Sequence, residues 1–108
     1  MAKSSKQVNV RRLVLDVLKP HQPRIDVLAI AIGELDGVES VNIIRAETDS
    51  STEGIIVTIV GGKLIFSEIE KTLRDYGSSI HSVDEVVAGE RIIDTVVIPD
   101  EEDRINQL

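Results

Sequence analysis

The order in which helix-like and strand-like segments follow one another constrains this chain more than any single motif. Two segments repeat apolar residues every three or four positions, as an amphipathic helix does, and four are rich in β-branched residues, as strands are. We expect helices from Pro23 to the Asp36-Gly37 pair and at 64–76, and strands at 12–18, 38–48, 54–60 and 79–88. The order is therefore strand, helix, strand, strand, helix, strand.

Right-handed crossovers convert this order into one compact arrangement. The four strands form an antiparallel sheet in the spatial order 4-1-3-2, and both helices cover the same face. The predicted fold class is thus α+β, a ferredoxin-like βαββαβ sandwich. Gly61-Gly62 is expected to end the third strand, and Ile93–Ile98 is a candidate for a short extra C-terminal strand.

The chain of 108 residues is long enough for one domain with a sizeable core. Its first seven residues, "MAKSSKQ", are polar, and the residues after Ile98 are rich in acidic side chains. We therefore expect a flexible N-terminus at 1–7, a single ferredoxin-like domain at 8–98 and an acidic C-terminal tail at 99–108.

Composition excludes several classes of function. There is no cysteine, so disulfides, thiolate catalysis and Cys-ligated metals are absent, and with one Phe, one Tyr and no Trp the core must be aliphatic. The net charge of −7 and the scarcity of aromatic stacking groups disfavour nucleic-acid binding. No apolar run approaches the roughly 18 residues of a membrane span. We expect a soluble, cytoplasmic protein.

The sheet of the predicted fold has a second face that no helix covers. Simple alternation along the strands places six aliphatic residues on this face, namely Val14, Leu18, Ile44, Ala46, Ile56 and Val60. A contiguous aliphatic patch of this kind is typical of an interface between proteins. The sequence therefore predicts a homo-oligomer that associates through the open sheet face.

Three stretches give the chain a specific resemblance. "RRLVLDVLKPHQP", "LDGVESVNI" and "SIHSVDEVVAGERI" together resemble an archaeal family of small proteins classed as a domain of unknown function. The resemblance covers roughly Val10–Ile93. It implies a ferredoxin-like fold, an archaeal source and a homo-oligomer. It implies no activity, and it supplies no functional residues to carry over.

Topology brings a group of possible metal ligands to one end of the sheet. The loop after the first strand, the hairpin between the second and third strands and the start of the fourth strand contribute His21, Glu47, Asp49, Glu53 and His81. Oxygen ligands suit Ca²⁺ or Mg²⁺, and imidazoles shift the preference towards Zn²⁺. A neighbouring subunit could complete such a site. No EF-hand loop or HExxH helix is present, and a solvated acidic hairpin explains the acidic residues more simply.

Two other features of the first strand and its loop attract attention. Asp16 lies among aliphatic residues on a central strand, where an acid needs a partner, and Ser82, His81 and Arg12 are its candidate partners. A structural ion pair or an interface contact is the preferred interpretation of Asp16. The loop "PHQP" is interpreted as a stiff corner that aims the following helix, with His21 as its reactive member.

Three functions remain open at this point. The preferred one is a non-enzymatic, homo-oligomeric module that binds an unknown small ligand or regulates another process. The second is a protein that binds a divalent cation at the loop edge or at a subunit boundary. The third is a small hydrolase or transferase with His21 or His81 as general base; it is the weakest, because no nucleophile elbow, P-loop or GxGxxG is present. No catalytic residue and no organic cofactor is assigned.

Overall fold

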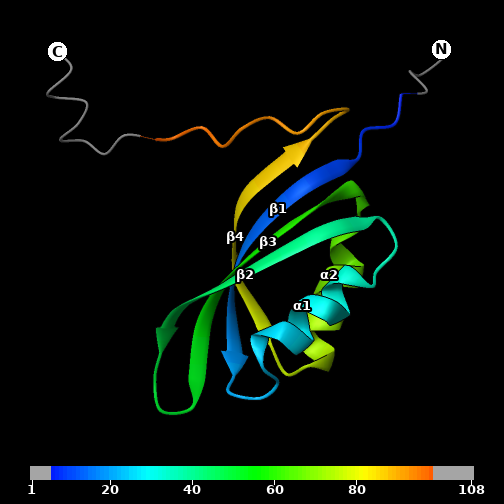
Figure 1. Ribbon diagram of the computed structural model, residues 1–108. Helices are drawn as coiled ribbons and strands as arrows, with labels where there is room; N and C mark the ends of the chain where they lie inside the picture. Colours follow the sequence, from blue (N-terminus) through cyan, green and yellow to red (C-terminus); the bar gives the residue numbers. More distant parts are fainter. Residues whose placement is uncertain (1–5, 99–108) are drawn as a thin grey trace, which may run out of the picture.

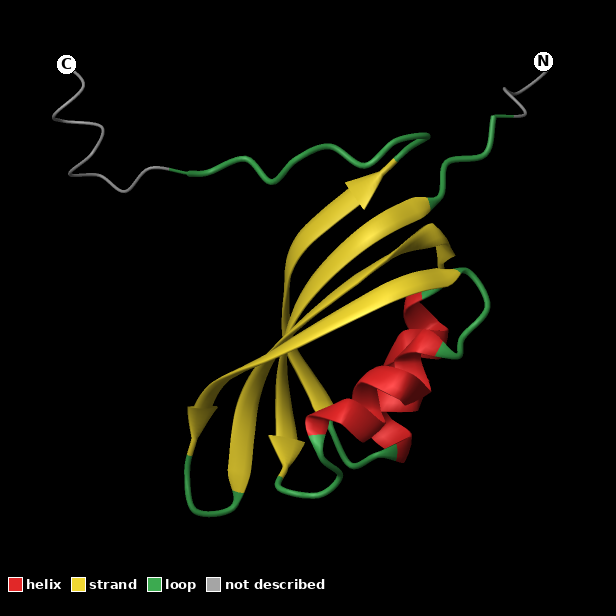
Figure 2. Ribbon diagram, viewed as in Figure 1, coloured by secondary structure: helices red, strands yellow, loops and turns green. Residues whose placement is uncertain are grey.

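The computed structural model of the protein describes residues 6–98 and contains six regular elements. They are β1 (Val10–Pro20), α1 (Ile25–Gly33), β2 (Val38–Thr48), β3 (Thr52–Leu64), α2 (Phe66–Asp75) and β4 (Ser79–Ala88). All strand pairs are antiparallel, and the sheet order is β2-β3-β1-β4. Both helices lie on one side of this sheet (Figures 1 and 2). The predicted ferredoxin-like fold and strand order are confirmed.

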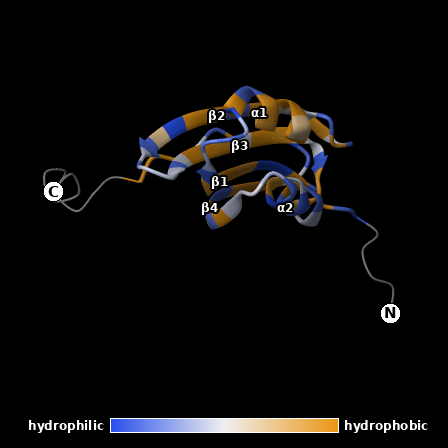
Figure 3. Cartoon of the chain, turned by 90° about the horizontal axis from the view of Figure 1, so that it is seen from below, coloured by the Kyte–Doolittle hydropathy of each residue, from blue (hydrophilic) through white to orange (hydrophobic). Residues whose placement is uncertain are grey.

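Alternation along the two central strands builds the core. Odd-numbered residues of β1 and β3 face the helices, whereas their even-numbered neighbours face the other way. The buried core consists of Leu13, Leu15, Val17, Leu28, Ile32, Ile55, Val57, Ile59, Leu64, Ile69 and Leu73. It is entirely aliphatic, as the composition requires. Hydrophobic residues recur along the strands in Figure 3.

The prediction that Gly61-Gly62 ends the third strand is wrong, because β3 continues to Leu64. A Cβ atom at Gly61 would lie 1.9 Å from the carbonyl oxygen of Gly37, and a Cβ atom at Gly37 would lie 2.1 Å from that of Lys63. Gly37 also has a φ of +87°, which glycine adopts without strain. These glycines therefore allow the turn after α1 to lie directly against the end of β3.

The two helices are shorter than their apolar stripes suggest. Helix α1 begins at Ile25 rather than Pro23, because Arg24 has an extended backbone (ψ 158°). Leu28 and Ile32 are buried, and Ile25 and Leu35 pack against the core from either end. Since α1 ends at Gly33, Leu35 makes its contact from the turn that leads to β2.

The C-terminal part of the described chain differs from expectation. Residues 92–98 form no strand, so the candidate fifth strand at 93–98 is not present within the described chain. After β4 the chain turns at Gly89 (φ +133°) and leaves the sheet (Figure 1). The predicted acidic tail at 99–108 and residues 1–5 of the predicted flexible N-terminus lie outside the described residues. Within 6–98 no helix has the length and apolar content needed to cross a membrane.

Candidate functional site

The five predicted metal ligands separate into two groups on opposite faces of the sheet. Glu53 is paired with Lys19 and Thr48 on the side of the helices, whereas its neighbour Gly54 is paired with Glu47 on the open side. Adjacent strand residues point to opposite faces, so the register itself divides the group. No three His, Cys, Asp or Glu side chains converge on one point among residues 6–98.

His21 and Glu53 do meet, at the loop edge on the helix side. The Nδ1 atom of His21 lies 3.2 Å from Glu53 Oε2, and its Nε2 atom lies 3.2 Å from the carbonyl oxygen of Ser50. Both partners are acceptors, so only the protonated imidazole donates to both at once. The bond to Glu53, followed by that to Ser50, raises the pKa of His21. In return, the bonds from His21 and Lys19 lower the pKa of Glu53.

Asp49 uses its carboxylate to shape the hairpin between β2 and β3. Its Oδ1 atom accepts hydrogen bonds from the backbone N–H groups of Ser51 (3.0 Å) and Thr52 (3.1 Å) and from the Thr52 hydroxyl (3.2 Å). These bonds, led by that from Ser51, lower the pKa of Asp49. The arrangement is an Asx-type turn, in which the acid replaces a backbone acceptor.

The strongest polar arrangement at this edge involves a residue that the sequence reasoning missed. Lys19 is 0% exposed. Its ammonium group lies 2.8 Å from the carbonyl oxygen of Pro20, 3.4 Å from that of His21 and 3.2 Å from Glu53 Oε1, and it also donates to the carbonyl oxygen of Pro23. A buried lysine needs such a set of acceptors. Lys19 therefore holds the Pro20–Pro23 corner, which includes a cis peptide bond between Gln22 and Pro23.

A signal for Lys19 was present in the sequence. Leu13, Leu15 and Val17 form the inward row of β1, and the next member of this row is Lys19. The predicted strand ended at Leu18, one residue before it. A lysine at an inward position is expected to find oxygen acceptors, and the carbonyl groups of the proline-rich corner follow directly in the sequence.

The open face of the sheet carries the predicted aliphatic residues. In the strand register Val14 is opposite Thr58, and Ile44 is opposite Ile56, which in turn is opposite Asp16. Leu18 and Val60 continue these even-numbered rows on β1 and β3. Ala46 occupies a bulge in β2 and lines a groove on the same face. Leu18 is 47% exposed and Ile44 is 58% exposed, so much of this apolar surface contacts solvent.

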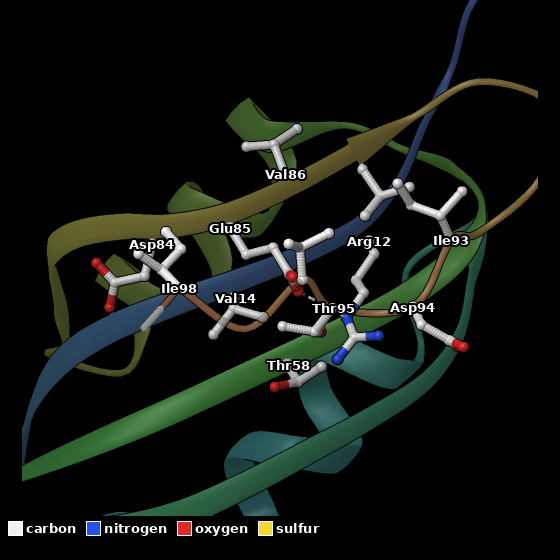
Figure 4. Close-up of a pocket in the computed structure, with 12 residues that line it drawn as sticks. Arg12, Val14, Thr58, Asp84, Glu85, Val86, Ile93, Asp94, Thr95 and Ile98 are labelled. Atoms are coloured by element: carbon white, nitrogen blue, oxygen red, sulfur yellow. Dashed lines mark ion pairs between the residues drawn. The ribbon is translucent and has the colours of Figure 1, made fainter. Parts of the chain in front are cut away.

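Two grooves mark the open face. The larger has a volume of about 570 Å³ and is bounded by β1, β3, β4 and residues 93–98 (Figure 4). Val14 and Thr58 line it, and Arg12 and Glu85 form an ion pair of 3.0 Å within it. Its combination of aliphatic walls and one charged pair suits a small ligand with both apolar and polar parts.

The smaller groove, of about 450 Å³, collects several residues that the sequence had singled out. It is lined by Asp16, Val17, Leu18, Ala46, Glu47, Gly54, Ile56 and His81. Two of the predicted metal ligands, Glu47 and His81, therefore share a groove with Asp16 and with the aliphatic surface. They lie on the face opposite to His21 and Glu53.

The predicted pairing of Asp16 needs correction. Arg12 pairs with Glu85, and the Ser82 hydroxyl donates to Asp84 at 2.7 Å. No hydrogen bond or ion pair joins Asp16 to any side chain within residues 6–98. The expectation treated Asp16 as buried between two layers, whereas it is only partly buried and faces a groove that is open to water.

Comparison with known proteins identifies the family of the chain. Residues 11–102 match the family DUF211, which is described as uncharacterized ArCR. The chain is also 47% identical over 90 residues to the uncharacterized protein MJ0319 of Methanocaldococcus jannaschii; the match covers 83% of this chain and 93% of the relative. The resemblance to an archaeal family of unknown function is thus confirmed, and the chain belongs to the DUF211 family.

Proposed function

We propose that this protein is a non-enzymatic module that assembles into a homo-oligomer through its open sheet face and holds a small ligand in the grooves of that face. The observation that carries the proposal is the exposure of aliphatic side chains on that face, led by Leu18 and Ile44. Burial of one such side chain is favourable by about 1.5–3 kcal/mol. A second copy that covers this face would gain that energy several times over.

The position of the grooves supports a role in binding. Both grooves lie on the face that a second copy would cover, so assembly would close them from solvent. Their volumes, about 570 and 450 Å³, are in the range of small-molecule sites. Each combines aliphatic walls with charged side chains, the Arg12–Glu85 pair in one and Asp16 in the other. The ligand we propose is therefore amphipathic.

The contacts at the loop edge support a non-enzymatic role. His21, the predicted reactive residue of the corner, has both ring nitrogens next to acceptors. Glu53 is occupied by His21 and Lys19, and Asp49 by its own turn. These groups act on one another and on the backbone, which is the work of a structural brace.

The oligomeric state of an Ile56→Glu variant tests the proposal. A charge at the centre of the open face should dissociate the assembly, and native mass spectrometry of the untagged protein should record a smaller species. Ile30→Glu is the matched control, because Ile30 is 62% exposed on α1, on the helix side of the sheet. An unchanged mass for Ile56→Glu, or dissociation by Ile30→Glu alone, would show that the interface lies elsewhere.

The same measurement in EDTA separates apolar association from metal-dependent association. We expect the mass of the assembly to be equal with and without the chelator. An assembly that carries metal and falls apart in EDTA would contradict the apolar interface and favour a divalent-cation site.

A further inference from the structure

The last described segment has the composition of a strand but pairs with nothing. Residues 92–98, here called the C-terminal arm, read "IIDTVVI", and six of these seven residues are β-branched. Ile93, Val96, Val97 and Ile98 are 62–84% exposed. Figure 3 shows hydrophobic residues up to the point where the described chain ends. A segment this apolar is rarely left in water.

The backbone of the C-terminal arm is also without partners. The contacts that follow β4 are a hydrogen bond from the Gly89 N–H to the Asn9 carbonyl oxygen (3.0 Å) and bonds from the Arg11 side chain to the carbonyl oxygens of Gly89 and Glu90. Residues 92–98 make no backbone hydrogen bond to the rest of the described chain. An apolar, β-branched segment with free N–H and C=O groups is suited to pair with a sheet edge.

The sheet offers two edges, and they differ in regularity. The β1–β4 register shifts twice in its middle, between Val14 and Leu15 and between Asp16 and Val17, so β4 is an irregular edge. In contrast, β2 pairs with β3 without a shift from Ser40 to Arg45. Bulges hinder the addition of a further strand. The regular stretch of β2 is therefore the edge that can accept the arm.

An arm cannot reach the β2 edge of its own chain. Four residue steps separate Ala88, the end of β4, from Ile92, and they span about 14 Å at most. A strand added outside β2 would lie four strand spacings from β4, about 19 Å. The strand that pairs with β2 must therefore come from another copy of the chain.

We propose that the C-terminal arm of each subunit adds as an extra strand to the β2 edge of a neighbouring subunit. This inference rests on the homo-oligomer of the proposed function and names a second contact within it. Arm and β2 edge are different surfaces, so the contact is head-to-tail, and repetition around an axis closes a ring. Residues 93–98 already border the larger groove of the open face, so this arm would join two subunits beside the proposed ligand site.

Disulfide cross-linking tests this contact, and the absence of native cysteines makes it clean. Val96→Cys is combined in turn with Ser40→Cys, Asn42→Cys and Ile44→Cys, since a bridge requires Cα atoms about 4.4–6.8 Å apart. After oxidation, at least one pair should give a ladder of dimers and higher species on a non-reducing gel, which reducing agent abolishes. Each single variant and the pair Val96→Cys with Ser82→Cys, on β4, are the controls.

The outcomes separate this inference from the proposed function. If native mass spectrometry finds an assembly but no β2 pair cross-links, the arm contact is refuted and the sheet-face interface stands. A ladder with Ser82→Cys and none with the β2 positions would refute the choice of edge. Cross-linking with β2 while Ile56→Glu leaves the mass unchanged would support the arm and refute the sheet face. A monomeric protein would refute both.

Discussion

Lys19 and Asp16 are three residues apart on β1 and point to opposite faces of the same sheet. Lys19 is fully buried on the helix side and donates to three carbonyl oxygens and a carboxylate. Asp16 faces the open side, where no other side chain of the described chain pairs with it. One charge is completely provided for within its own subunit, and the other is left to solvent or to a partner.

The same contrast extends to the apolar residues on the two faces. On the helix side the aliphatic residues of β1 and β3 are buried, and on the open side Leu18 and Ile44 are largely exposed. One face is thus complete in the monomer, whereas the other retains surface that can still be buried. This difference is why we assign structure to the loop edge and binding to the open face.

The largest effect is expected at Lys19. Lys19→Met keeps the length of the side chain but leaves Glu53 and three carbonyl groups of the corner without their donor. We expect a loss of about 3–5 kcal/mol in the free energy of unfolding, as is typical when one partner of a buried charged contact is removed. Urea unfolding measures it, with Lys63→Met, an exposed lysine of β3, as the control. A loss below about 1 kcal/mol would show that Lys19 does not hold the corner.

The counterpart at Asp16 should cost little. Asp16→Asn keeps the shape of a side chain that faces a water-filled groove and has no partner within residues 6–98. The free energy of unfolding should therefore change by no more than about 0.5 kcal/mol. Urea unfolding under the conditions used for Lys19→Met decides it. A loss as large as that of Lys19→Met would remove the contrast between the two faces.

The smallest effect is a pH dependence at the loop edge. The raised pKa of His21 means that its contact stabilises fully below the ordinary histidine value of 6.5, and that this stability is lost as pH rises through the raised pKa. The lowered pKa of Glu53 means that its contribution is full above 4.5 and is lost as pH falls through the lowered pKa. The contact is therefore strongest between about pH 4.5 and 6.5.

A His21→Ala variant checks this window. The variant should be less stable than the parent at pH 5.5, and the difference should shrink at pH 8.5, where the histidine of the parent is neutral. Gln22→Ala, an exposed neighbour in the same corner, serves as control. A difference that is equal at both pH values would mean that protonation of His21 does not stabilise this edge.

Much of the fold followed from local pattern. The ranges 38–48 and 79–88 were predicted as strands and are observed with these bounds as β2 and β4. Turn glycines misled the prediction for β3, because Gly61 reads as a strand end in the sequence but provides room for Gly37 in the structure. That close approach joins residues 24 positions apart, so no local pattern reports it.

The candidate site was predicted less well, and the reason is strand register. Sequence alone could gather His21, Glu47, Asp49, Glu53 and His81 at one end of the sheet, but a single step in register sends each side chain to one face or the other. Glu53 joined Lys19 and His21, while Glu47 and His81 went to the groove of Asp16.

The sequence by itself determined the order of elements, the aliphatic core and the existence of an apolar open face, because each depends on periodicity within short segments. Only the tertiary structure decided which charges are satisfied and which segments stay unpaired. The Lys19–Glu53 contact, the free edge of β2 and the solvent-exposed arm all depend on where strands distant in sequence come to lie side by side. Burial and hydrogen-bond partners are properties of that arrangement, and local sequence does not contain them.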